Sequence, residues 1–258
     1  MAASRITTAI ERRYGTAPDV PAGLPHPDAF AALNARSVCR RYRPDPVPGA
    51  VVRYLCATAL AAPTKSDLQQ ATIIRVADPA KRAAICALLP GSPWLKPAPE
   101  LLIFCADGWR FRRLFEKKKA TFVNDHLDAF FNATVDAAIV LGTFVAAAEL
   151  AGLGTCPISQ IRDHVWKIDE LLGLPDWVVP VAGLALGFPS TKEPMSARLA
   201  LSATVHTDRY DAAAVERELD AYDARRGKDW SGDKVRQYST VWRADFGAFV
   251  RRKKFRLE

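Results

Sequence analysis

The chain has 258 residues, of which 49% are hydrophobic and 25% are charged. This composition excludes global disorder, and the length favours one large domain or two small ones. The net charge of +8 favours anionic partners, such as a phosphorylated cofactor, nucleic acid or acidic lipid, without choosing among them.

The first half of the chain is expected to mix helices and strands. Residues 1–27 predict a short helix and an irregular arm rich in proline and alanine, and residues 28–258 are expected to form the main domain. Apolar residues at helical spacing after Pro48 predict a helix. The elements expected in this half are a helix over 48–62, a polar loop over 62–67, a strand over 72–76, a helix over 79–89 and a strand over 101–105.

The second half contains the longest apolar segment. Residues 133–151 predict a helix that is too polar at Asp136 and Glu149 for a membrane span, and is better packed in the core or in a dimer interface. The other expected elements are a basic helical stretch over 108–127, a strand over 156–158, a helix over 163–172, a strand over 178–187 with Pro180 at an edge or bulge, and two C-terminal helices.

Helices and strands alternate without a regular β-α-β repeat. The sequence therefore predicts an α+β fold with a small mixed or antiparallel central sheet flanked by helices. Neither a Gly-x-Gly-x-x-Gly nor a phosphate-binding P-loop motif occurs.

Cysteine and histidine usage argues against a metal centre. The five cysteines are widely spaced in apolar contexts without a Cys-x-x-Cys, which is typical of buried thiols in a reducing, cytoplasmic setting. The four histidines lack ligand spacing to one another or to cysteine, so we expect no metal. A basic nucleic-acid-binding protein is a rival interpretation, but no zinc-finger spacing or RNA-recognition signature occurs, so we expect no nucleic-acid partner.

Two polar segments in the first half could bind an anion. On a helix, Arg36 and Arg40 would share a face and, with Ser37, could clamp a phosphate; the alternative is a solvated basic turn. The loop over 63–69 gathers hydroxyls, an ammonium and an amide between a helix and a strand, and could equally be an ordinary turn or cap.

A third polar segment follows the long apolar helix. Gly152 and Gly154 would let the backbone approach a flat ligand before Ser159 and Gln160, and Arg198 lies further along the chain. The alternative is a helix cap and a surface arginine.

In this order, these segments resemble the FMN-dependent nitroreductase family, and most closely its NADPH-linked, oxygen-insensitive nitroreductase and flavin reductase branch. The similarity runs from about residue 28 to the C-terminus, and no single motif carries it. The ordered set comprises the arginine–serine motif with PDPVP after it, APTKSDLQ, LLIFCAD, ELAGLGTCPISQIR, LALGFP, ARL, VHTDRY and DWSGDKVRQY with FVRRKKF.

The resemblance implies an intertwined homodimer with FMN at each of two interface sites. No side chain is expected to be catalytic, because N5 of FMN would carry the hydride. Arg226 matches an arginine that engages NADPH. The residues that match the family's FMN contacts are Arg36, Ser37, Arg40, Thr64, Lys65, Ser66, Gln69, Ser92, Pro157, Ile158, Ser159, Gln160 and Arg198.

Three departures distinguish the chain from the family pattern. Cys39 lengthens the first motif by one residue, and Ser196 stands where the branch often has lysine. Ser159 and Gln160 replace what is often a pair of glycines, which would narrow the space over the ring.

The implied activity is hydride transfer from NADPH or NADH to a small organic acceptor, such as a nitroaromatic, a quinone or a flavin, in a ping-pong cycle. The alternatives are reductive dehalogenation or flavin fragmentation on the same fold, and a non-catalytic flavin-binding protein. The basic stretch over 108–128 could be a lid, or a helix that covers a dimer edge. No membrane partner is expected.

Overall fold

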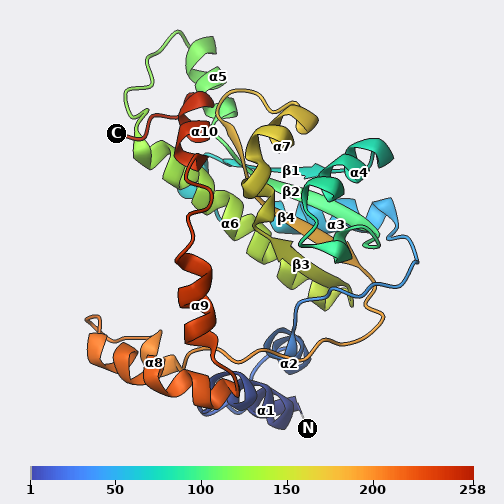
Figure 1. Cartoon of the computed structure of the whole chain (residues 1–258), viewed down its shortest axis with the longest axis vertical. Coiled ribbons are helices and arrows are strands. Elements are labelled where there is room, and N and C mark those ends of the chain that lie inside the picture. The colour runs from blue at the N-terminus through green and yellow to red at the C-terminus, as the bar shows by residue number, and fades with distance from the viewer. Residues whose placement is uncertain (1) are drawn as a thin grey trace. The chain divides into compact units, whose positions relative to one another are not determined.

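The computed structural model describes residues 2–258, and the chain divides into two compact units (Figure 1). The helical unit comprises the residues up to Ser37 together with Glu193–Trp242. The sheet unit comprises Val38–Lys192 together with Arg243–Glu258. Each unit is therefore assembled from two separate stretches of sequence.

A four-stranded antiparallel sheet forms the centre of the sheet unit, in the order β1-β2-β4-β3. The two middle strands pair although about 80 residues separate them in the chain, and both are almost entirely buried. The strands are β1 (Ala71–Arg75), β2 (Glu100–Asp107), β3 (Gly154–Ile158) and β4 (Val178–Gly187).

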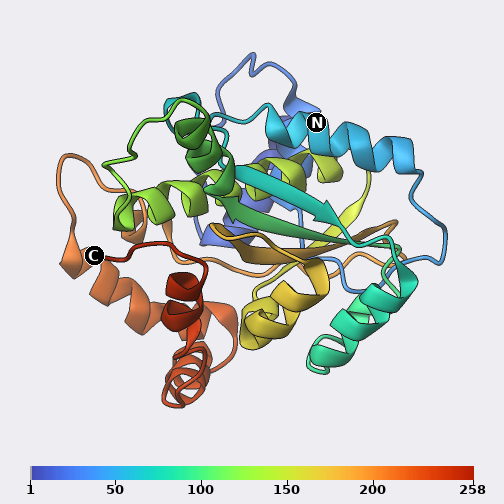
Figure 2. The same ribbon diagram turned by 90° about the horizontal axis from the view of Figure 1, so that it is seen from above.

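Helices cover both faces of this sheet (Figure 2). Leu102 and Phe104 of β2 face a core that they share with α3 and α6, whereas Leu101 and Ile103 face a second core shared with α4 and α7. This alternation follows from the two-residue repeat of a strand, and the strand is apolar throughout because both faces are covered. These helices are α3 (Gly49–Leu60), α4 (Pro79–Leu88), α6 (Leu127–Leu150) and α7 (Val165–Leu172).

Two further helices and three short turns complete the sheet unit. Phe249 and Val250 of α10 pack with Val165 and Val179 in a third apolar cluster. The elements are α5 (Trp109–Lys117), α10 (Phe246–Arg252) and the 3-10 turns η1 (Lys65–Asp67), η2 (Pro93–Leu95) and η3 (Gln160–His164).

The helical unit contains no strand within its described residues. Its elements are α1 (Ala2–Tyr14), α2 (Pro27–Ala35), η4 (Leu201–Ala203), α8 (Ala212–Arg226) and α9 (Trp230–Tyr238). Glu218 of α8 is buried, accepts a hydrogen bond from the Ala200 amide and pairs with Arg225. These contacts attach α8 to the irregular stretch that precedes it.

The predicted α+β class and all four predicted strands are confirmed. Pro180 lies at a bulge, because the register shifts between Phe104 and Cys105, but β4 is a central strand rather than an edge strand. The bulge accommodates a residue that cannot donate to the ladder.

Three predicted elements differ from the structure. Residues 36–40 are not helical, because Arg36 is extended and the Cys39 amide donates to Thr155 of β3. The basic stretch over 108–127 is helical only as far as Lys117, where the helix ends. Three helices rather than two occupy the C-terminal part, since α10 follows α8 and α9.

Candidate functional site

An arginine cluster occupies the helical unit. Burial and then the charge of Arg198 lower the pKa of Arg13, and the charge of Arg36 lowers it further, so both of these guanidinium groups act on that of Arg13. The Arg198 amide donates to the Arg13 carbonyl, and Arg13 donates to the carbonyls of Asn34 and Arg36. No carboxylate within residues 2–258 pairs with any of the three. Two of these three were predicted site residues.

One atom of this cluster lacks any hydrogen-bond partner. Nε of Arg36 is buried and unsatisfied, which is costly unless an acceptor reaches it. Three like charges and an orphaned donor fit an anionic group with several oxygen acceptors, such as a phosphate. The structure thus offers a basis for the predicted roles of Arg36 and Arg198.

Arg225 and Arg226 of α8 adjoin the same stretch. Arg225 donates to the Arg198 carbonyl at 2.6 Å, and Arg226 donates to the Tyr222 hydroxyl at 2.8 Å. The Ala197 carbonyl accepts from Arg198 at 3.2 Å and from Arg226 at 3.4 Å. The structure therefore brings Arg226, predicted to engage NADPH, next to the arginine cluster. Ser37 is half-buried at the end of the helical unit.

In the sheet unit, Arg40 lies beside β3. Its guanidinium stacks over the Trp94 ring, 4.9 Å from the centroid, and lies beside the Cys156 thiol. Burial raises the pKa of Cys156 more than Arg40 lowers it, so the thiol is held neutral. Cys156 directly precedes Pro157, and Arg40 thus adjoins the segment predicted to lie over the ring.

The segment 157–160 leaves β3 and enters η3. Ile158 is buried, whereas Pro157 and Ser159 are exposed. The Ser92 hydroxyl, itself buried, bonds to the Gln160 side-chain oxygen, so two predicted site residues meet. The Ser159 hydroxyl accepts from Arg243 at 3.2 Å, and Arg243 also pairs with Asp163.

A single buried carboxylate holds the loop that carries four predicted residues. Asp136 of α6 accepts from the Lys65 amide at 3.0 Å and from the Gln70 amide at 3.1 Å, at opposite ends of the loop. The Thr64 hydroxyl accepts from the Gln69 amide at 2.9 Å. Left-handed backbone at Ser66, which residues other than glycine rarely adopt, shows that this loop is held in shape rather than relaxed.

Within the loop, the predicted side chains are turned outward. Lys65, Ser66 and Gln69 are exposed, and the Lys65 ammonium donates to the Ser66 hydroxyl at 3.3 Å. Within residues 2–258, no hydrogen bond joins this loop to the segment 157–160. In one chain, the two predicted halves of the ring site are therefore not bonded to each other.

Four residues of this arrangement were not predicted. Arg13, Trp94 and Arg243 lie far in sequence from the motifs that they contact, so no local pattern marks them. Asp136 carried a signal, because a lone carboxylate in a long apolar helix must find partners when it is buried. Its partners, however, lie 66 and 71 residues away.

Comparisons with known proteins agree with the resemblance. The family model described as the Nitroreductase family matches residues 33–188. A protein of Bacillus subtilis named FMN reductase NAD(P)H is 32% identical over 219 residues, covering 82% of this chain and 88% of that one. An oxygen-insensitive NADPH nitroreductase of Salmonella typhimurium is 30% identical over 200 residues, covering 75% and 82%.

Solved structures extend the similarity to the fold. A hypothetical oxidoreductase, YcnD, of Bacillus subtilis superposes with a TM-score of 0.84 at 28% identity, covering 90% of this chain and 99% of that one. NfrA2 of B. megaterium superposes with a TM-score of 0.81 at 30% identity, with the same coverage.

Proposed function

The chain belongs to the nitroreductase family, and from this premise we propose that it binds FMN and transfers hydride from NAD(P)H to a small organic acceptor. The observation that carries the proposal is the cluster of Arg13, Arg36 and Arg198, with its unsatisfied Arg36 Nε. The names of the relatives, FMN reductase and NADPH nitroreductase, support the same reaction class.

The arginines would hold the phosphate. Arg36, Ser37 and Arg198, all of the helical unit, would bind it. Burial and then the charges of Arg198 and Arg36 lower the pKa of Arg13; a phosphate would offset the repulsion between these charges and would satisfy the orphaned Arg36 donor. Arg13 acts as a positioning residue, because its guanidinium is bonded to the carbonyls of Asn34 and Arg36.

The loop 64–69 and the segment 157–160 would bind the ring. Asp136 fixes the loop at both ends, and Arg243 fixes Ser159, so both segments are held before the ligand arrives. The Ser92 hydroxyl and the Gln160 side-chain amide, which are hydrogen-bonded to each other, would contact the ring. When bound, FMN supplies the hydride-accepting and hydride-donating ring, so no side chain is required as a nucleophile.

We propose that the active unit is a homodimer. Leu127, Phe131, Val135 and Ile139 recur every four residues on α6 and are 36–61% exposed, which forms an apolar stripe. No hydrogen bond joins the two predicted halves of the ring site within residues 2–258 of one chain, so a second copy could bring the loop of one protomer to the 157–160 segment of the other. Phe131→Glu is then expected to shift the mass in light scattering from dimer to monomer.

The composition of α6 does not require a membrane. Within residues 2–258 it is the one helix long and apolar enough to cross a bilayer, a test that the core helix of a soluble protein also passes. Its other face packs against β2 and α3. We propose a cytoplasmic protein without membrane or nucleic-acid partners, a setting in which the five free cysteines would stay reduced.

An absorbance spectrum of the purified protein, followed by anaerobic titration with NADPH and NADH, tests the proposal. We expect a flavin spectrum, or its appearance on reconstitution with FMN, and bleaching by a nicotinamide. A protein that takes up no FMN, or whose FMN neither nucleotide reduces, contradicts it.

Variants locate the phosphate site. Arg36→Ala and Arg198→Ala are each expected to weaken FMN binding by about 1.5–3 kcal/mol, or roughly 10- to 150-fold in Kd, the range for a hydrogen bond to a charged group. Arg217→Ala, on the exposed surface of α8, serves as the matched control. Equal Kd values for all three variants in a fluorescence titration would reject the assignment.

A further inference from the structure

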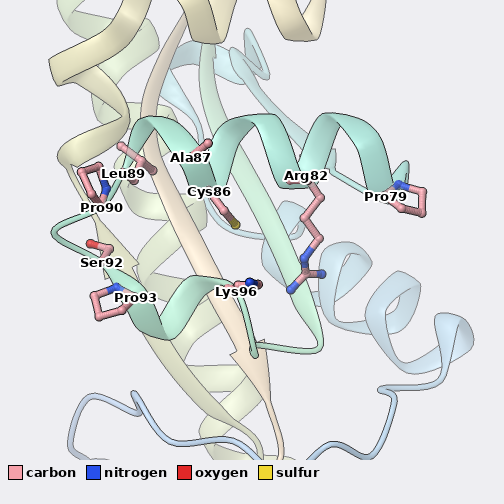
Figure 3. A pocket seen from close by; sticks show the side chains of 10 residues that line it. Pro79, Arg82, Cys86, Ala87, Leu89, Pro90, Ser92, Pro93 and Lys96 are labelled. Atoms are coloured by element: carbon pink, nitrogen blue, oxygen red, sulfur yellow. The ribbon is translucent and has the colours of Figure 1, made fainter.

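A pocket of about 570 Å³ lies between α4 and the segment that follows it (Figure 3). This volume falls within the range of small-molecule sites. One wall is a single face of α4, because Pro79, Arg82, Cys86 and Ala87 recur at helical spacing. The facing wall is the turn that leads through Ser92 to Lys96.

The walls are mainly apolar. Proline rings, two alanines, a leucine and the half-buried Cys86 form most of the lining. Burial raises the pKa of the Cys86 thiol more than the nearby Arg82 and Lys96 charges lower it, so the thiol adds another weakly polar surface. An occupant must therefore present a largely apolar body.

Two cations lie at this pocket, and they differ in their partners. The Arg82 guanidinium donates to the Pro99 carbonyl at 2.8 Å and the Leu95 carbonyl at 3.4 Å, which fixes the facing wall. Within residues 2–258, the Lys96 ammonium makes no hydrogen bond or ion pair, and this residue is exposed. In Figure 3, Arg82 and Cys86 point from α4 toward the segment that carries Lys96.

We propose that this pocket binds an amphipathic carboxylate, with its apolar body against α4 and its carboxylate on the Lys96 ammonium. Because Lys96 is a single cation without a partner, it suits a ligand with one negative charge better than a phosphate, which would need several donors. The apolar lining contributes affinity by burying the body of the ligand, and the ammonium selects its charge.

The pocket also shares a residue with the candidate flavin site. Ser92 lines the pocket and bonds to Gln160 of the segment 157–160. An occupant that displaces Ser92 would therefore alter the position of Gln160. The site itself does not depend on FMN, so its occupancy and the proposed activity can fail separately.

Calorimetric titration of the purified protein, with any FMN that it carries, uses decanoate as the probe. We expect saturable binding that Lys96→Met weakens about tenfold, the scale for a lost hydrogen bond between charged groups. Lys81 is an exposed lysine of α4 that does not line the pocket, so Lys81→Met is the matched control and should bind as the parent does.

Ala83→Trp tests the location, because Ala83 is exposed and lines the pocket. The indole should fill the pocket and abolish binding; Ala87→Trp replaces it if the circular dichroism spectrum shows that the first variant is misfolded. Decanoate should also slow alkylation of Cys86 but not of Cys56, the other half-buried thiol. Absence of saturable binding, or affinity unchanged in Lys96→Met or in the folded tryptophan variant, overturns the proposal.

Discussion

Removing the Asp136 carboxylate should release the loop that carries four predicted flavin contacts. Each of its oxygens accepts one backbone amide, from Lys65 and from Gln70, and the side chain is only 2% exposed. Asp136→Asn keeps one acceptor and places an amide nitrogen against the other N–H. Asp136→Ala leaves both donors without a partner.

The expected cost follows from these two bonds. A hydrogen bond to a charged group contributes about 1.5–3 kcal/mol, so Asp136→Asn should lower the free energy of unfolding by about 1.5–3 kcal/mol and Asp136→Ala by about 3–6 kcal/mol. The loop also stores strain at three left-handed residues other than glycine, which favours its local rearrangement once the anchor is lost. These three are Ser66, Asp67 and Gln69.

Urea denaturation measures the global change, and amide hydrogen exchange at Lys65 and Gln70 measures the local one. Asp128→Asn is the control, because that residue is exposed in the first turn of the same helix and, within residues 2–258, its carboxylate accepts only from the Asn132 side chain. If Asp136→Asn lowers stability no more than this control does and leaves both amides protected, the anchoring argument is wrong.

Three further predictions concern other contacts. Arg112→Met removes a guanidinium buried among three aromatic rings and paired with an aspartate, and urea denaturation should show a loss of about 3–5 kcal/mol, the range for breaking a buried pair. Burial tends to raise the pKa of Glu218, but hydrogen bonds from Arg225 and a backbone amide lower it overall. The ionised carboxylate therefore contributes to the free energy of unfolding above about pH 4.3, and this contribution is lost as the pH falls through the folded pKa. Glu218→Gln should flatten the acid limb of a curve of unfolding free energy against pH. Iodoacetamide at pH 8 should label Cys56 and Cys86 before the buried thiols. Burial raises the pKa of the Cys105 thiol to about 12, so mass spectrometry that finds Cys105 labelled first would contradict this prediction.

The fold was more predictable from the sequence than the site. The strand over 178–187 is apolar on both faces, and its predicted bounds match β4 because a sheet covered on both sides leaves a continuous apolar run. The shared face considered for Arg36 and Arg40 required a helix, and the structure has none there because the Cys39 amide bonds to β3.

The candidate site was found only as separate motifs. Arg36 and Arg198 could be named, but their meeting at Arg13 depends on tertiary packing between distant segments. The same holds for Ser92 and Gln160, which lie 68 residues apart. Local patterns report residue type and spacing, and they do not report which loops meet.

The split composition of the helical unit has a consequence for biosynthesis. Its first stretch leaves the ribosome early, whereas Glu193–Trp242 follows only after most of the sheet unit has been made. During translation α1 and α2 can pack against each other early, whereas the bond from the Arg198 amide to the Arg13 carbonyl forms only after almost 200 residues have been made. The arginine cluster is therefore completed late in synthesis, after all four strands of the sheet unit have left the ribosome.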